Sequence, residues 1–342
     1  MSEDSVSLGP AFGERELVLG DKRRYRALGL TVETELAFRT KLLPSAQAPD
    51  LRFRITRGAQ PPDWPVSADA VFESTYQNEA GNPLFSIHPG ANGQLLRFPE
   101  IADYFLTSGL VHGHLVDPDY GYMMEAHFLG MVLAYWLELA GILTLHASAV
   151  SVGNRAVAFL GTNKAGKSSL AVAMMQRGCP LLSDDIVGLV TDDSGVHARP
   201  GFPSMRMWPD LAQHAKGAGW EQLPLVHPDL DKRRVDVGPG GFGRFIDEVQ
   251  PLACVYIPER RDVRDDDLDV SIEPVPRANA VFELLREAFF PWLAQDAEFG
   301  ADRLRILGEF VQRVPVRRLV YPAGFQYLPR IAERVLADLA ER

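Results

Sequence analysis

The 342-residue sequence is poor in cysteine, with only Cys179 and Cys254. Two cysteines supply neither a disulfide framework nor the spacing of a metal site, and they are typical of a reducing cytoplasm. No stripe of basic residues interleaved with aromatic ones is present, and a net charge of −10 disfavours contact with nucleic acid. These absences exclude a disulfide-stabilised scaffold and predict a cytoplasmic protein that has no nucleic-acid partner.

Long uninterrupted apolar runs are also missing. The most apolar helical segment, residues 124–140, contains Glu125, His127 and Glu138, so we expect a buried core helix and no membrane partner. The N-terminus does not show the basic and then apolar pattern of a signal peptide. A hydrophobic content of 46% over this length allows a large core, and it predicts two domains.

The most informative stretch that is present, residues 161–169, fits the P-loop pattern G-x-x-x-x-G-K-[ST]. Its glycines let backbone N–H groups face phosphate oxygens, Lys167 brings a cation to the β- and γ-phosphates, and the Ser168 hydroxyl is placed to ligate Mg²⁺. An apolar strand at 156–160 precedes the loop and a helix at 169–176 follows it, a context that favours nucleotide binding over a glycine-rich turn. The predicted nucleotide-binding residues are Gly161, Thr162, Asn163, Lys164, Ala165, Gly166, Lys167, Ser168 and Ser169.

A pair of carboxylates follows the loop. Asp184 lies 17 residues after Lys167, and Asp184 and Asp185 come at the end of a short apolar strand within residues 181–187. We expect this strand to run parallel to the P-loop strand, because ligands of open α/β folds bind at the carboxyl ends of parallel strands. One carboxylate can then hold Mg²⁺ while the other takes a proton from an attacking hydroxyl. The alternative is a solvated acidic turn.

A histidine lies upstream of the loop. Residues 142–150 are expected to form one strand that turns back into the P-loop strand, and His146 precedes Gly161 by 15 residues. A strand–turn–strand of this length returns the chain close to its starting point, which would bring His146 near the phosphates. A lone histidine in an apolar strand is otherwise a core residue, so its position alone leaves both interpretations open.

Together these segments resemble the catalytic domain of HPr kinase/phosphorylase. The resemblance is closest to the HPr-kinase-like proteins encoded with ribosomally made peptides, including the lasso-peptide serine kinases. It implies a fold like that of the phosphoenolpyruvate carboxykinase P-loop group, with ATP and Mg²⁺ as cofactors. The residues that carry it are Leu145–Ser148, Gly161–Ser169, and Arg177-Gly178 followed by Leu182–Asp185.

The resemblance also implies roles for the site residues. Asp184 would be the general base on a serine hydroxyl, assisted by His146, while Asp185 and Ser168 would hold the metal. The sequence departs from the family pattern at Lys164, where a small residue is usual, and over 236–250, where the family's partner-binding signature is not recognisable. HPr itself is therefore not the expected substrate, and phosphorylase activity is not implied.

Phosphoryl-transfer enzymes also use an arginine or lysine to neutralise the transferring group. Lys232 and Arg233 are the preferred candidates for this role, and Arg206 is the alternative. We include Arg233 among the predicted catalytic residues and Lys232 among the nucleotide-binding ones. The competing interpretation of each is a solvated surface charge.

The predicted domain organisation has three parts. Residues 1–15 are expected to form a flexible tail, 16–122 a β-rich N-terminal domain, and 123–342 the HPr-kinase-like P-loop domain of α/β class. Exposed strand edges in the β-rich domain would suit capture of an extended peptide. Nothing in the sequence decides the oligomeric state, so a homo-oligomer stays open.

The function predicted from the sequence is that of an ATP- and Mg²⁺-dependent kinase that phosphorylates a serine of a peptide or small protein. Two alternatives stay open. The acceptor could be a small molecule such as a sugar or nucleoside, or the chain could be a nucleotide-binding regulatory module with little turnover. The grouping of His146, Asp184 and Asp185 argues against the second alternative, because a sensor needs no general base.

Overall fold

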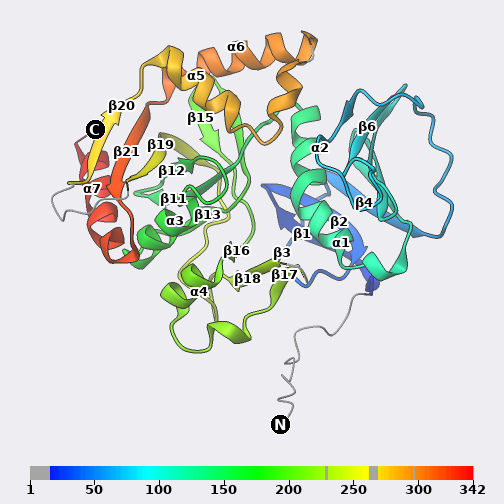
Figure 1. The fold of residues 1–342 in the computed structure, drawn as a ribbon, viewed down its shortest axis with the longest axis horizontal. Coiled ribbons are helices and arrows are strands. Elements are labelled where there is room, and N and C mark those ends of the chain that lie inside the picture. The colour runs from blue at the N-terminus through cyan, green and yellow to red at the C-terminus, as the bar shows by residue number, and fades with distance from the viewer. Residues whose placement is uncertain (1–15, 228–229, 262–268, 296, 342) are drawn as a thin grey trace.

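The computed structural model describes residues 16–227, 230–261, 269–295 and 297–341. The tail predicted at 1–15 therefore lies outside the described residues. Two nine-stranded sheets and one three-stranded sheet, with helices packed on them, form a mixed α/β fold (Figure 1). Within the described ranges, no helix combines the length and the apolarity needed to cross a membrane.

The N-terminal sheet follows the expectation of a β-rich region. Its strands are β1 (Leu19–Ala27), β2 (Leu30–Leu36), β3 (Leu43–Pro44), β4 (Leu51–Arg57), β5 (Phe72–Glu73), β6 (Ser86–Gly90), β7 (Gly93–Phe98), β8 (Ala102–Thr107) and β9 (Leu110–Leu115). They lie in the order β3-β1-β2-β4-β9-β8-β7-β6-β5. In β4, Leu51 and Phe53 are fully buried while Arg52 is exposed, because successive side chains point to opposite faces.

A broken helix covers the inner face of this sheet (Figure 1). It consists of α1 (Met123–His127), a wide π-helical turn (Phe128–Val132) and α2 (Leu133–Leu139). The buried helix predicted at 124–140 is thus present, with an interruption at Gly130, where φ is −107° and ψ is −111°. Phe128 stacks on Phe53 with ring centroids 3.9 Å apart, so by packing the helix belongs to the N-terminal sheet. The domain boundary at 122 stays a prediction.

The second sheet contains the P-loop strand. Its strands are β10 (Leu143–Leu145), β11 (Ala147–Val152), β12 (Arg155–Leu160), β13 (Leu181–Ser183), β14 (Val187–Asp192), β15 (Gly195–Ala198), β19 (Gln250–Arg261), β20 (Ser271–Pro274) and β21 (Val316–Pro322). β12, β19 and β21 are parallel neighbours, and β11 pairs antiparallel with both β12 and β13. β13 therefore runs in the direction of β12, as predicted, although β11 separates the two strands.

One strand predicted as continuous is interrupted. The expected strand 142–150 is divided between β10 and β11 at His146, and this break releases the histidine from an otherwise apolar strand. The strand expected within 181–187 ends at Ser183, directly before the two carboxylates, and the chain resumes as β14 at Val187.

Helices cover both faces of the second sheet. Cores on its two faces contain residues of α3 (Lys167–Gln176) and α7 (Leu328–Ala340) on one side, and of α5 (Arg277–Arg286) and α6 (Ala297–Arg313) on the other (Figure 1). The third sheet, in the order β16-β18-β17, lies beside α4. Its elements and the remaining short helices are β16 (Ser204–Met207), α4 (Pro209–Lys216), η3 (Trp220–Gln222), β17 (Leu225–His227), β18 (Leu230–Asp236), η1 (Pro118–Tyr120), η4 (Pro291–Gln295) and η5 (Phe325–Tyr327).

The turn between β1 and β2 joins the two halves of the molecule. Arg199 donates from Nε to the carbonyl oxygen of Leu28 and from Nη2 to that of Gly29, both at 2.9 Å. Arg26 forms an ion pair with Asp247 at 3.2 Å. These contacts hold the N-terminal sheet against two segments of the other half, one between β15 and β16 and one between β18 and β19.

Candidate functional site

The loop Gly161–Ser169 connects the end of β12 to the first turn of α3. Gly166 has φ +102°, and a Cβ atom there would lie 2.6 Å from the Tyr321 hydroxyl, so only glycine fits. Lys164 also has a positive φ of +64°, and Arg260 Nη2 donates to its carbonyl oxygen at 2.6 Å. The loop is thus held in a compact shape at the N-terminus of a helix, where backbone N–H groups favour an anion.

Lys167 lies inside the loop. Its side chain is buried, and Nζ donates to the carbonyl oxygens of Gly161 at 2.6 Å and Thr162 at 2.9 Å. Burial lowers the pKa of this ammonium group, while the carboxylates of Asp185 and Asp184 oppose the shift. The Lys167 ammonium group is therefore held by carbonyl groups of the loop that the sequence pattern assigns to phosphate binding.

Asp184 is buried and accepts three hydrogen bonds. Its Oδ1 accepts from the hydroxyls of Ser148 at 2.6 Å and Ser168 at 3.1 Å, and its Oδ2 accepts from the Arg206 backbone N–H at 3.1 Å. Burial and the neighbouring charge of Asp185 raise the pKa of Asp184 to about 6, although the three hydrogen bonds oppose the shift. This carboxylate connects β13 directly to the P-loop serine.

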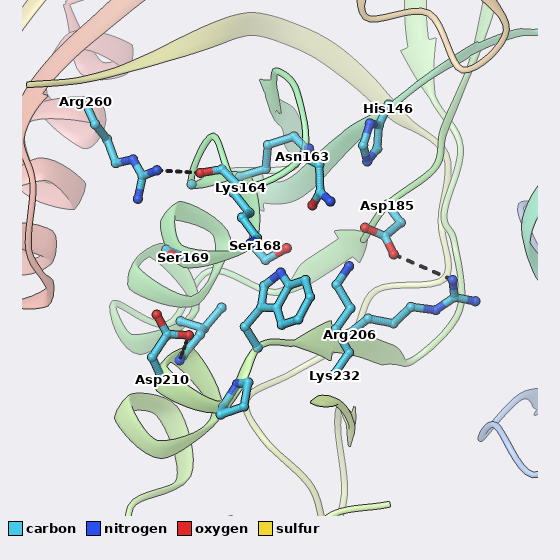
Figure 2. Close-up of a pocket in the computed structure, with 15 residues that line it drawn as sticks. His146, Asn163, Lys164, Ser168, Ser169, Asp185, Arg206, Asp210, Lys232 and Arg260 are labelled. Carbon is cyan, nitrogen blue, oxygen red and sulfur yellow. Dashed lines mark hydrogen bonds and ion pairs between the residues drawn. The ribbon is translucent and has the colours of Figure 1, made fainter. Parts of the chain in front are cut away.

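Asp185 differs from its neighbour because it lines the cavity beside the P-loop (Figure 2). Its φ is +66°, and Arg206 Nη1 lies 3.8 Å from its Oδ2. Asp184 is not among the residues that line this cavity. The two adjacent carboxylates are therefore not equivalent: one supports Ser168 and the other faces the space where a ligand would bind.

His146 lies on the same side of the cavity as Asp185 (Figure 2). Its backbone N–H donates to the Glu287 carbonyl oxygen at 3.0 Å, and its ring meets Phe289 edge-on at 6.2 Å. Burial and then the charge of Lys167 lower the pKa of His146 to about 4, against the opposing charge of Asp185. The imidazole is therefore neutral at neutral pH.

The cavity has a volume of about 440 Å³. Five cationic side chains and two carboxylates line it, in a chain whose net charge is −10. This local excess of positive charge suits a polyanion such as a triphosphate. The charged lining residues are Lys164, Lys167, Arg206, Lys232, Arg260, Asp185 and Asp210.

The structure separates the two cations that the sequence proposed together. Lys232 lines the cavity, with Nζ 5.4 Å from the centroid of the Trp208 ring. Arg233 points away: its Nη1 donates to the carbonyl oxygens of Glu221 and Leu223, and its guanidinium lies over Trp220. This placement corrects the expectation for Arg233, because adjacent residues of β18 face opposite sides. Arg206, the alternative, does line the cavity.

Trp208 and Arg260 are among the cavity residues that were not predicted as site residues. Trp208 directly precedes α4, and the Lys164 and Lys232 ammonium groups lie over its ring, Lys164 Nζ at 5.0 Å from the centroid. Arg260 comes from the carboxyl end of β19, beside the P-loop strand. The apolar residues of β19 are the signal that could have placed Arg260 at the ligand-binding edge, because it follows them in the same strand.

The predicted metal ligands can be tested against their donor chemistry. Among the described residues, no group of three or more His, Cys, Asp or Glu side chains forms a ready metal centre. The Ser168 hydroxyl and the adjacent carboxylates instead provide a small oxygen donor set beside a phosphate-binding loop. This set fits Mg²⁺, which is usually held by few protein ligands together with substrate phosphates.

Comparisons with known proteins add little to this geometry. No protein-family model matches the chain, and no curated protein sequence matches it. Among solved structures, the Hpr(Ser) kinase/phosphatase from Coxiella burnetii is similar over 58% of this chain and 96% of its own, at 15% identity and a TM-score of 0.30. A similarity this low carries no argument about function, so the interpretation of the site rests on its own residues.

Proposed function

We propose that this protein is an ATP- and Mg²⁺-dependent kinase that transfers the γ-phosphoryl group to a hydroxyl, with a serine of a peptide or small protein as the acceptor. The observation that carries the proposal is the contact between the P-loop Ser168 and the buried Asp184, next to a cationic cavity that Asp185 and His146 face. The sequence pattern alone predicts nucleotide binding. Carboxylates and a neutral imidazole at the same cavity support group transfer as well.

Phosphate binding is assigned to the loop and to Lys167. The loop's N–H groups and the N-terminus of α3 favour the anion, and Lys167 can exchange its two carbonyl partners for phosphate oxygens. Lys232, Arg206 and Arg260 add positive charge around the transferring group. When bound, Mg²⁺ would supply further charge neutralisation at the phosphates, held through Ser168.

The contacts favour an exchange of the roles that the family resemblance implied for the two carboxylates. Both carboxylate oxygens of Asp184 already accept hydrogen bonds, three in total, and one of the donors is the Ser168 hydroxyl. The role of Asp184 is therefore to orient Ser168 for the metal. Asp185 reaches the cavity and is therefore the carboxylate that can accept the proton of an acceptor hydroxyl. His146, neutral and beside it, assists in holding that hydroxyl.

This proposal is tested by incubating candidate peptides and small-molecule acceptors with ATP and Mg²⁺, followed by mass spectrometry. Wild type should add about 80 Da per phosphate to a serine peptide, and Asp185→Asn should slow the transfer by about 10²- to 10⁴-fold while still binding ATP. Asp184→Asn should instead weaken the dependence of ATP binding on Mg²⁺.

Three other outcomes would change the proposal. Phosphorylation of sugars or nucleosides only would favour the small-molecule alternative. Tight ATP binding with no transfer to any acceptor would favour a regulatory module. Asp184→Asn abolishing transfer while Asp185→Asn retains it would restore the original assignment of the base.

A further inference from the structure

Asp185 occupies the apex of a tight turn. The Ile186 backbone N–H donates to the Asp184 carbonyl oxygen at 2.9 Å, and the φ of Asp185 is +66°. A hydrogen bond between residues i and i+2 around a positive φ describes the rarer, strained form of the γ-turn. Strain of this kind persists only where the surrounding contacts enforce it. The neighbours of Asp185 must therefore hold its carboxylate in place.

The two neighbours are held by different halves of the molecule. Asp184 is anchored in the P-loop half through Ser148 and Ser168. Ile186 is 3% exposed, and its side chain belongs to the hydrophobic core of the N-terminal sheet, together with Phe53. The Ile186 carbonyl oxygen also accepts a hydrogen bond from the Ser183 hydroxyl, which closes the turn.

We infer that Ile186 is a positioning residue through which the N-terminal sheet holds the Asp185 carboxylate at the cavity. This inference rests on the function proposed for Asp185. The N-terminal sheet is then part of what forms the site, in addition to any role in binding a partner. Ile186 follows β13 of the second sheet, but its side chain packs in the core of the N-terminal sheet. A shift of the N-terminal sheet would therefore move the Asp185 carboxylate in the cavity.

Two other residues repeat this arrangement. Phe202 belongs to the same N-terminal core and lies four residues before Arg206. Phe290 belongs to it as well and follows Phe289, whose ring meets His146. The segments that carry Asp185, Arg206 and the ring against His146 therefore each insert at least one apolar side chain into the core of the N-terminal sheet.

The test compares Ile186→Ala with a matched truncation in the same core, Ile87→Ala, because Ile87 is fully buried in β6 and far from the P-loop in sequence. Both variants should lose unfolding stability to a similar extent, as large-to-small changes in a core do. Only Ile186→Ala should lower kcat, by about 10- to 100-fold, with KM for Mg-ATP changed less than about threefold. Ile186→Val should restore most of the activity.

A second measurement does not require turnover. Asp185→Asn removes a negative charge beside the phosphates, so its affinity for metal-free ATP should rise by about twofold to fivefold. Ile186→Ala should also raise the affinity for metal-free ATP, because it displaces the Asp185 carboxylate. A variant that carries both substitutions should bind ATP little more tightly than Asp185→Asn alone, because both changes act on the Asp185 carboxylate.

The outcomes are distinguishable. If wild type transfers no phosphate but Ile186→Ala and Asp185→Asn still share their effect on ATP affinity, the proposed function fails and the positioning role stands. Equal effects of Ile186→Ala and Ile87→Ala on kcat and on ATP affinity would overturn the positioning role. If Ile186→Ala does not fold, Ile186→Val is compared with Ile87→Val: a smaller kcat loss that Ile87→Val does not share supports the positioning role, and equal kcat values for the two overturn it.

Discussion

The two halves of the molecule place their charged residues in different settings. On the N-terminal sheet, Glu33 lies within ion-pair distance of Arg24 at 3.0 Å, Arg54 at 3.2 Å and Arg52 at 3.7 Å. These four side chains pair with one another on the sheet itself. In the second half, five cations and two carboxylates instead line a cavity of about 440 Å³, where a ligand can contact them.

Topology explains this difference. In the N-terminal sheet the paired charges lie on the neighbouring strands β1, β2 and β4, where Arg24 and Arg52 are the register partners of Glu33, so they meet across the ladder. In the second sheet the parallel strands β12, β19 and β21 end at one edge and bring together loops that are distant in sequence. Charged side chains from distant segments meet beside these strand ends, and that is where a functional site can form.

The largest expected effect tests this contrast with two lysine truncations. Lys167→Ala should lower kcat/KM by about 10²- to 10³-fold, because it removes a preorganised cation from the transferring phosphates. Lys22→Ala, on the N-terminal sheet, removes only an exposed ion pair with Glu35 and should leave the rate within about twofold. Steady-state kinetics measures both, and equal rates for the two variants would contradict the assignment of the cavity.

A smaller effect separates two arginines of the same half. Arg206→Ala should lower kcat by about 10- to 100-fold, because its guanidinium faces the cavity beside Asp185. Arg233→Ala should leave kcat unchanged and cost about 0.5–2 kcal/mol of unfolding stability, since it loses two carbonyl contacts and a position over Trp220. Kinetics and urea denaturation give both quantities. A larger kcat loss for Arg233→Ala would restore the sequence prediction.

The smallest effect concerns pH and the buried carboxylate. The pKa of Asp184 is raised to about 6 in the folded protein, above its unfolded value, so the folded state binds this proton more tightly. That stabilisation is complete below about pH 4 and is lost as the pH rises through about 6. Because asparagine cannot ionise, the Asp184→Asn variant does not lose this stabilisation. Its free energy of unfolding minus that of wild type should therefore increase by about 1–3 kcal/mol as the pH rises from about 4 to 7.

The measurement is urea denaturation of wild type and Asp184→Asn between pH 4 and 7. The fall in the pKa of His146 acts in the opposite direction in the same range, but it is common to both proteins and largely cancels in the difference. A difference that shrinks as the pH rises would show that Asp184 is stabilised as the carboxylate, in the way that Glu33 is by its arginine partners.

Local patterns predicted the elements that lie closest to the site. Strand β12, the P-loop and helix α3 were expected from the sequence, because glycine, lysine and serine at this spacing are required by the loop itself. The Asp193-Ser194-Gly195 sequence indicates the hairpin of β14 and β15 for a similar reason, since turn residues act over a few positions. The break at His146 was not predicted, because strand-forming residues continue on both sides of it.

The sequence by itself determined which residues could bind a triphosphate, since that chemistry depends on residue types at short spacing. Only the tertiary structure decided which of Asp184 and Asp185 faces the cavity, and whether Arg206 or Arg233 joins it. Both outcomes depend on the side of a strand or turn toward which a side chain points. Packing against segments that are distant in sequence decides that direction. The core of the N-terminal sheet, which receives Ile186, is one of those segments.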